Sequence, residues 1–156
     1  MLDKKLKEKI IPALMLVFTI IGLMSAIYLT DLYYSTESSD TICDINSTVS
    51  CTNLAQSEYS DIGPVPIALL GVVAYLAFLL ISSLMLLPNF AKRICSCLTS
   101  KNLAKIMLIL TSIGMLFTVY LIAVELIIQI LCLGCFISWI ATGALWILSF
   151  IQYHKV

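Results

Sequence analysis

Hydrophobic residues along this chain gather in four long runs, and polar residues gather between them. The runs cover about residues 10–31, 66–87, 103–127 and 132–151. A helix of about 20 residues rises about 1.5 Å per residue and spans a hydrocarbon core of about 30 Å. The first run is longer than the apolar stretch of about 7–15 residues in a signal peptide, so we expect it to be a retained span. The pattern predicts an all-α integral membrane protein, a four-transmembrane-helix bundle that forms a single membrane domain over residues 1–156.

The one long polar segment, about residues 32–65, is expected to be an extracytoplasmic loop. Within it, the sequence from Ser50 to Tyr59 is typical of a short helix with Ser50 as its N-cap. The run from Gly63 to Pro66 then breaks the chain, and a proline in the first turn is a common start for a helix. The architecture expected is therefore a bundle with one outer loop that carries a short helix.

The composition agrees with a membrane protein and also orients it. The 156 residues are 61% hydrophobic and 12% charged, whereas soluble domains average about 45–50% apolar and about 25% charged residues. The basic residues precede the first span, separate the second from the third, or follow the fourth: Lys4, Lys5, Lys7, Lys9, Lys92, Arg93, Lys101, Lys105 and Lys155. Because basic loops stay inside the cell, both termini are predicted to be cytoplasmic. These basic residues are therefore interpreted as the signal that orients the spans in the bilayer. Nucleic acid is not expected as a partner.

Four of the six cysteines fall on the predicted outer side, which is the oxidising side in a cell. Cys43 and Cys51 lie in the loop, and Cys132 and Cys135 form a C-x-x-C at the start of the fourth span. Unpaired backbone N–H groups at a helix start favour a thiolate there, and this spacing brings both sulfurs to one face. Thiolate attack on a disulfide moves two electrons through a mixed disulfide. Two such pairs on one side predict a redox relay.

Other interpretations of the cysteines remain open at this stage. Cys43 and Cys51 fit a structural disulfide of the loop, as in a non-enzymatic four-span scaffold of the tetraspanin or claudin kind. That scaffold does not explain a C-x-x-C at the start of a span. A zinc site would need a second ligand cluster, and the only histidine is His154 at the far end, so no metal is expected. Cys95 and Cys97, on the cytoplasmic side, are interpreted as bystanders.

The relay needs an electron acceptor, and the chain has no glycine pattern for a nucleotide cofactor. A membrane quinone of the ubiquinone, menaquinone or vitamin K type is therefore expected to dock beside the C-x-x-C pair. Its pocket would be formed by apolar and aromatic side chains: Leu69, Leu70, Tyr75, Phe136 and Trp139. Side chains of these types are equally typical of the core of any helix bundle. Glu125, near the outer end of the third span, is a candidate for proton handling, and its simpler interpretation is a position at the membrane interface.

Several motifs resemble those of the vitamin K epoxide reductase family, in particular its microbial members. The loop carries a C-D-x6-C pattern from Cys43 to Cys51, with Ser57 six residues later. The second span opens with a P-x4-G-x3-Y pattern, and the third and fourth spans carry the remaining matches. These positions are Pro66, Gly71, Tyr75, Tyr120, Leu121, Glu125, Cys132 and Cys135. The resemblance extends from the first span to the end of the fourth. Four-span quinone-linked oxidases of another kind have their C-x-x-C in the first outer loop, an order that differs from this one.

The resemblance implies a mechanism. Cys43 would exchange with a reduced thioredoxin-like extracytoplasmic protein and end joined to Cys51, and electrons would pass from Cys51 to Cys132. Cys135 would then reduce a quinone from the membrane pool, with Ser57 helping to position its ring. Proteins outside the cytoplasm would gain disulfides.

Two departures from the vertebrate pattern concern the quinone pocket. Ile67 stands where vertebrate enzymes have an asparagine that contacts the quinone oxygen, and Trp139 stands where they have a tyrosine. Both favour a plain quinone over vitamin K epoxide. Some bacterial members carry a fused thioredoxin-like domain, whereas here the partner is expected to be a separate protein.

Overall fold

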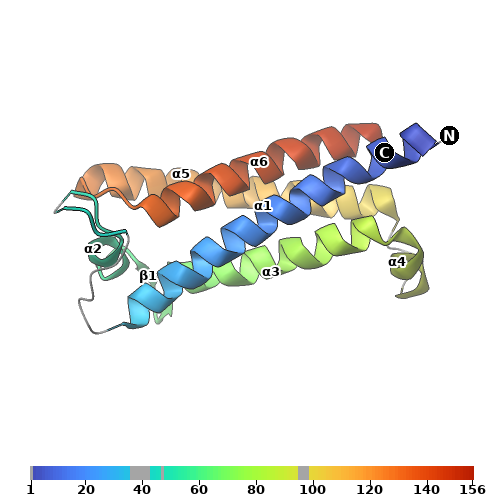
Figure 1. The fold of residues 1–156 in the computed structure, drawn as a ribbon. Coiled ribbons are helices and arrows are strands. Elements are labelled where there is room, and N and C mark those ends of the chain that lie inside the picture. The colour runs from blue at the N-terminus through green and yellow to red at the C-terminus, as the bar shows by residue number, and fades with distance from the viewer. Residues whose placement is uncertain (1, 36–42, 47, 95–98) are drawn as a thin grey trace.

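Four long helices make up most of the computed structural model, which describes residues 2–35, 43–46, 48–94 and 99–156. They are α1 (Leu2–Tyr34), α3 (Ile67–Leu86), α5 (Ser100–Ile128) and α6 (Leu133–Lys155) (Figure 1). Each is long and apolar enough to cross a membrane, with a mean hydropathy of 1.8 to 2.5 over its most apolar stretch. In α1 that span begins at Lys9. The predicted four-transmembrane-helix bundle is confirmed.

The connections between the long helices contain four short elements. These are α2 (Cys51–Ala55), β1 (Asp61–Ile62), β2 (Val65–Pro66) and α4 (Pro88–Ile94). The sequence predicts α2 with its cap: the backbone N–H of Asn53 donates to the Ser50 hydroxyl oxygen at 3.1 Å. It does not predict α4 or the small β1–β2 hairpin. Gly63 turns this hairpin with a φ of 66°, a backbone conformation that glycine adopts without steric cost.

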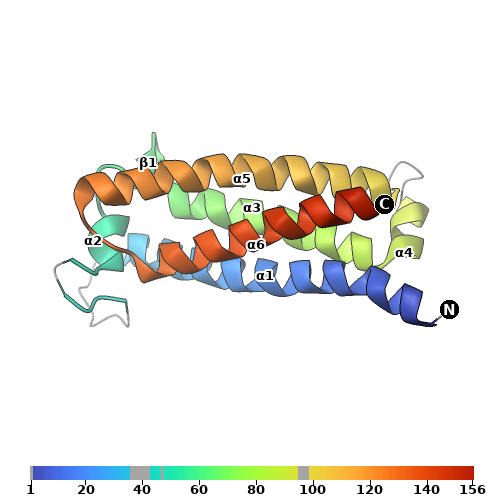
Figure 2. The ribbon, with the colours of Figure 1, turned by 90° about the horizontal axis from the view of Figure 1, so that it is seen from above.

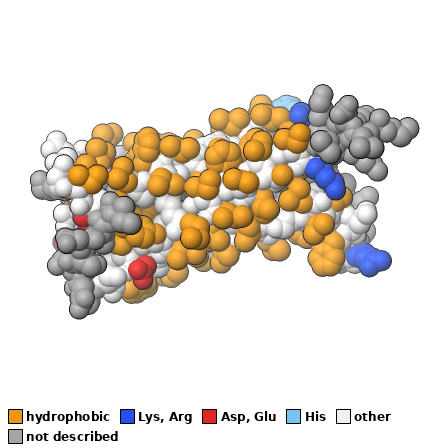
Figure 3. All heavy atoms as spheres, viewed as in Figure 1, with side chains coloured by type: hydrophobic (Ala, Val, Ile, Leu, Met, Phe, Trp, Pro, Cys, Tyr) orange, Lys and Arg blue, Asp and Glu red, His pale blue; other side chains and the backbone are white. Residues whose placement is uncertain are grey.

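The helices run up and down, so that both chain termini and α4 lie at one end of the bundle (Figures 1 and 2). The opposite end carries α2 and the β1–β2 hairpin. Helix α1 packs along α3 and α6, and α5 packs along α6. Met15, Met107 and Leu145 are fully buried between them. Large apolar side chains also cover the outside of the bundle (Figure 3), and an exposed apolar surface of this extent is what a lipid environment requires.

The two ends of the bundle differ in charge. Figure 3 shows Lys and Arg at the end that carries the termini and α4, and Asp and Glu at the other end. The predicted orientation in the membrane depends on this difference.

Two hydroxyl side chains hold the helices together near the acidic end. The Ser25 hydroxyl of α1 donates to the carbonyl of Gly134 in α6 at 2.6 Å. The Tyr75 hydroxyl of α3 lies 2.9 Å from the Ser138 carbonyl and 2.9 Å from the Thr142 hydroxyl, both in α6. Interhelical hydrogen bonds of this kind stabilise helix packing in an apolar medium. Helix α6 is therefore held against α1 and α3 where its first turns begin.

Candidate redox site

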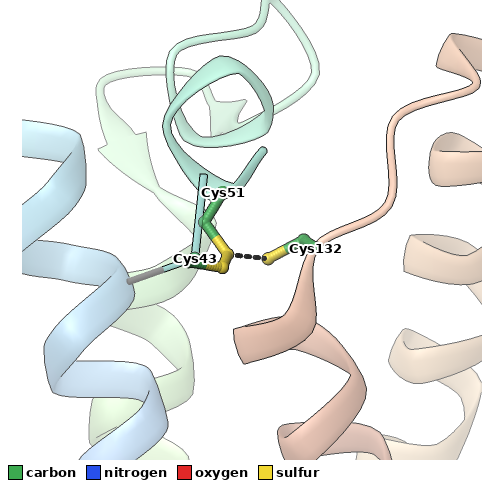
Figure 4. A group of neighbouring side chains, drawn as sticks. All are labelled: Cys43, Cys51 and Cys132. Atoms are coloured by element: carbon green, nitrogen blue, oxygen red, sulfur yellow. Dashed lines mark hydrogen bonds between the residues drawn. A yellow bond between two sulfur atoms is a disulfide. The ribbon is translucent and has the colours of Figure 1, made fainter. Parts of the chain in front are cut away.

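Three of the cysteines meet at the acidic end of the bundle. Cys43 and Cys51 form a disulfide, and the Sγ of Cys132 lies 3.3 Å from the Sγ of Cys51 (Figure 4). All three are buried, with exposed fractions of 5%, 0% and 2% respectively. The structure thus brings the two predicted pairs together, whereas Cys95 and Cys97 lie outside the described residues.

Backbone pairing explains why Cys51 and Cys132 are neighbours. Val49 and Leu131 form a parallel β-bridge, in which the Ser50 N–H donates to the Leu131 carbonyl at 3.1 Å. The Leu131 N–H in turn donates to the Thr48 carbonyl at 2.8 Å. This bridge fixes the loop to the segment between α5 and α6. Cys51 comes shortly after Val49 and Cys132 directly after Leu131, so the bridge brings the two cysteines together. No residue type in either segment marks the bridge, and the sequence does not reveal it.

A second set of contacts holds the loop disulfide against α2. The carboxylate of Asp44, which follows Cys43, accepts hydrogen bonds from the backbone N–H and the hydroxyl of Thr52, which follows Cys51. Asn46 closes the turn between them, because its side-chain oxygen accepts from the N–H groups of Thr48 and Val49 at 2.9 and 2.8 Å. The C-D pattern is therefore structural as well: Asp44 ties the two ends of the disulfide loop together.

The C-x-x-C pair opens α6 as the sequence predicts. Cys132 is the N-cap residue, and its Sγ accepts a hydrogen bond from the N–H of Cys135 at 3.2 Å. Reactive cysteines are commonly found at helix N-termini, where backbone donors reach the sulfur. Both Cys132 and Cys135 are free thiols in this structure.

A cavity of about 370 Å³ lies inside the bundle next to the sulfurs. Its volume is within the range of about 300–1,000 Å³ that is typical of small-molecule pockets. Its wall comes from α1, α2, α3, α5 and α6, and it includes Cys51, Cys132 and Cys135. Five of the seven residues predicted for a quinone pocket also line it: Ser57, Ile67, Leu70, Tyr75 and Trp139.

Leu69 and Phe136 are the exceptions among the predicted pocket residues. Neither is among the residues that line the cavity, and 55% of the Phe136 side chain is exposed. Its ring packs edge-on against Trp139, with centroids 6.0 Å apart. Helical periodicity explains the difference, since Cys135 and Trp139 are one turn apart on one face and Phe136 is rotated by about 100° from Cys135.

Most polar groups of the cavity already have partners. The Ser57 hydroxyl donates to the Leu54 carbonyl at 2.8 Å, and the Tyr75 hydroxyl is bonded to α6. The indole Nε1 of Trp139 is different: it is buried and has no partner within the described part of the chain. A residue of the cavity wall therefore carries a buried hydrogen-bond donor that no described group satisfies.

Glu125 brings a carboxyl group to the same wall. Only 4% of it is exposed, so it lies inside the bundle, three residues before the end of α5 at Ile128. One of its oxygens and the sulfurs of Cys132 and Cys135 all lie within 4.8 Å of one another. Its Oε1 has no hydrogen-bond partner among the described residues.

A comparison with models of known protein families identifies the family to which this chain belongs. The model of the vitamin K epoxide reductase family matches residues 13–150. The chain belongs to the vitamin K epoxide reductase family. The match includes all four cysteines of the site and Glu125, and membership makes the protein a redox enzyme of the membrane. Neither the search of curated proteins nor the search of solved structures gave a match.

Helix α1 contributes residues to the site that the motifs in the sequence do not single out. Tyr28 of α1 packs against the cysteine cluster, and its buried hydroxyl has no partner among the described groups. Ala26, Leu29 and Tyr33 of the same helix line the cavity. The spacing of Leu29 and Tyr33, together with Ala26, places them on one helix face. That periodicity could have indicated a wall of the site.

The cysteine sulfurs and the Glu125 carboxyl group also lie close enough together to be considered as metal ligands. Two groups have ligand atoms within 4.8 Å of one another: Cys43, Cys51 and Cys132, and Glu125, Cys132 and Cys135. A disulfide offers no thiolate, so the first group cannot act as a metal site while Cys43 and Cys51 are joined. Short distances between the sulfurs of each group are also what disulfide exchange requires.

Proposed function

We propose that this family member is a quinone-dependent thiol:disulfide oxidoreductase. It takes electrons from a separate thioredoxin-like protein through Cys43 and Cys51, and passes them through Cys132 and Cys135 to a quinone in the membrane. The observation that carries the proposal is the 3.3 Å between the sulfurs of Cys51 and Cys132. A disulfide bond measures about 2.05 Å, so a mixed disulfide between them needs only a small displacement.

The transfer between the pairs balances within the protein. The Cys51 thiolate attacks Cys132 of an oxidised C-x-x-C, which breaks the Cys132–Cys135 bond, forms a Cys51–Cys132 mixed disulfide and releases Cys135. Cys43 then attacks Cys51, closes the loop disulfide and releases Cys132. Two electrons move to the C-x-x-C pair, and the two thiol protons are exchanged with it. The structure, with a loop disulfide and two free thiols, corresponds to the product of this transfer.

The cavity supports a quinone as the oxidising substrate. Its volume is about 370 Å³, its wall is mainly apolar, and the Cys135 side chain lies on that wall. The free indole N–H of Trp139 suits a carbonyl oxygen, which is the only strong acceptor of a plain quinone ring. These features favour a small aromatic acceptor that enters from the bilayer.

The loop pair is the proposed entry point for electrons from outside. The basic end of the bundle faces the cytoplasm in this proposal, so the loop faces the extracytoplasmic side. The exposed fraction of Cys43 is only 5%, and a partner's thiolate must reach its sulfur. Attack by the partner therefore requires the segment around Cys43 to move away from Cys132.

The direct test is oxidation of a reduced thioredoxin-like protein by the purified chain in detergent, with ubiquinone, menaquinone or vitamin K quinone added. We expect loss of two partner thiols for each quinol formed, and without quinone only the single loss of two thiols that the loop disulfide itself can oxidise. The Cys135→Ser variant should be inactive, while Cys95→Ser and Cys97→Ser variants should retain activity. If no quinone supports turnover and all four outer cysteines stay in fixed disulfides, the scaffold interpretation replaces this proposal.

A further inference from the structure

Glu125 is a buried carboxyl group that the relay of sulfurs does not use. It lies in the last turns of α5, 4% exposed, on the wall of the cavity. Burial of a carboxyl group at membrane depth is costly, and such residues commonly serve a function. Its Oε1 has no partner among the described residues and is therefore available to a further donor.

The surroundings of Glu125 indicate which function that is. The titratable groups that face it are the thiols of Cys132 and Cys135, from α6. Tyr33 of α1, Tyr59 beyond α2 and Tyr75 of α3 line the same cavity. No lysine, arginine or histidine of the described chain interacts with the carboxyl group. Glu125 is therefore no member of an ion pair, and the groups within its reach are those whose protons must leave during oxidation.

We propose that Glu125 is a catalytic proton carrier: it accepts a proton from the C-x-x-C pair as that pair is oxidised, and gives it to a carbonyl oxygen of the quinone. This inference rests on the proposed function. In the overall step both S–H bonds break, one S–S bond forms, and two electrons reduce the quinone to a quinol. Glu125 transfers one proton and returns to its starting state. The other thiol proton leaves to water, and the second quinol proton is taken from water.

The first test compares Glu125→Gln, which keeps size and shape, with wild type. General acid–base groups contribute about 10²–10⁴-fold to rate, so we expect kcat with quinone to fall at least about tenfold, with little change in KM. One limb of the pH–rate profile should disappear. Glu125→Asp should recover part of the rate, because it restores a carboxyl group. Glu58→Gln is the matched control, since Glu58 is an exposed carboxylate at the same end of the bundle.

A second test needs no quinone. Infrared difference spectra are recorded while the C-x-x-C pair is oxidised and reduced chemically in the purified chain. We expect a carboxylic acid C=O band that changes with the redox state in wild type and in Glu58→Gln, and that is missing in Glu125→Gln. Formation of the Cys51–Cys132 mixed disulfide in a Cys135→Ala background serves as the check that the Glu125→Gln variant is folded.

The outcomes separate this inference from the proposed function. If wild type reduces a quinone and folded Glu125→Gln does so at the same rate with the same pH profile, Glu125 carries no proton and the inference is wrong. If wild type reduces no quinone, the proposed function fails first. The infrared band then decides alone whether Glu125 exchanges a proton with the thiols, and its presence in Glu125→Gln would exclude that.

Discussion

Replacement of Cys135 by alanine should convert the close approach of Cys51 and Cys132 into a covalent bond. The Cys132 sulfur lies 3.3 Å from the Cys51 sulfur. A bond of about 2.05 Å requires the two sulfurs to approach by about 1.3 Å, which rotation of two side chains can supply without movement of a helix. In the proposed relay, such a mixed disulfide is resolved either by Cys43, which attacks Cys51, or by Cys135, which attacks Cys132 and releases Cys51. Without Cys135, that route to resolution is lost.

The exchange in this variant creates no new oxidising equivalent. Cys132 attacks Cys51, the Cys43–Cys51 bond breaks, and Cys43 leaves as a thiolate that is able to reverse the reaction. A maleimide that alkylates the released Cys43 should therefore drive the variant toward the Cys51–Cys132 form. We expect this form to become the main species, identified as a cross-linked peptide by mass spectrometry under non-reducing conditions.

The matched control is Cys132→Ala, which keeps Cys135 and removes the sulfur beside Cys51. It should yield the Cys43–Cys51 loop and little or no Cys51–Cys135 peptide. If Cys135→Ala shows only the Cys43–Cys51 loop after alkylation, the proposed order of electron transfer is wrong. Equal cross-linking through Cys135 in the control would show that the observed geometry does not select the reacting sulfur.

Three further substitutions test the cavity and the loop. Gly22→Ala should destabilise the bundle by roughly 1–3 kcal/mol in thermal unfolding, because a Cβ there collides with the Tyr75 ring, whereas Gly143→Ala meets no atom within 4 Å and should have little effect. Trp139→Phe removes the free N–H but keeps an aromatic wall; the loss of about 1 kcal/mol should raise KM for quinone about fivefold and leave the Cys51–Cys132 trap unchanged. Ser50→Ala removes the N-cap of α2, worth about 1 kcal/mol, and should speed amide hydrogen exchange in that helix.

The sequence predicts the fold well because a membrane span has a strong signal. A run of about 20 apolar residues has few alternatives in water or lipid, so all four spans appear within a few residues of the expected bounds. The cap of α2 was predictable for a similar reason, since Ser50 has a side chain that bonds to its own backbone three residues on. Local rules of this kind do not need the rest of the molecule.

The geometry of the site depends on contacts that have no such local signature. The bridge between Val49 and Leu131 uses only backbone groups, so any residues could form it. The close packing of Gly22 against Tyr75 joins two helices whose rotation the apolar pattern leaves open, because every face of a lipid-exposed helix is hydrophobic. Single positions are therefore less secure than the fold, as the outward side chain of Phe136 illustrates.

In the proposed function, the need for two cysteine pairs follows from where the electron donor and acceptor can go. A quinone is confined to the bilayer, and the cavity that suits it is walled by five helices, so a folded partner protein cannot enter. The proposed partner would meet the loop, where Cys43 is joined to Cys51 at the start of α2. Neither pair contacts both environments. The buried contact between Cys51 and Cys132 connects them. In this proposal, electrons therefore cross from the aqueous side to the bilayer through sulfurs that are buried in the bundle.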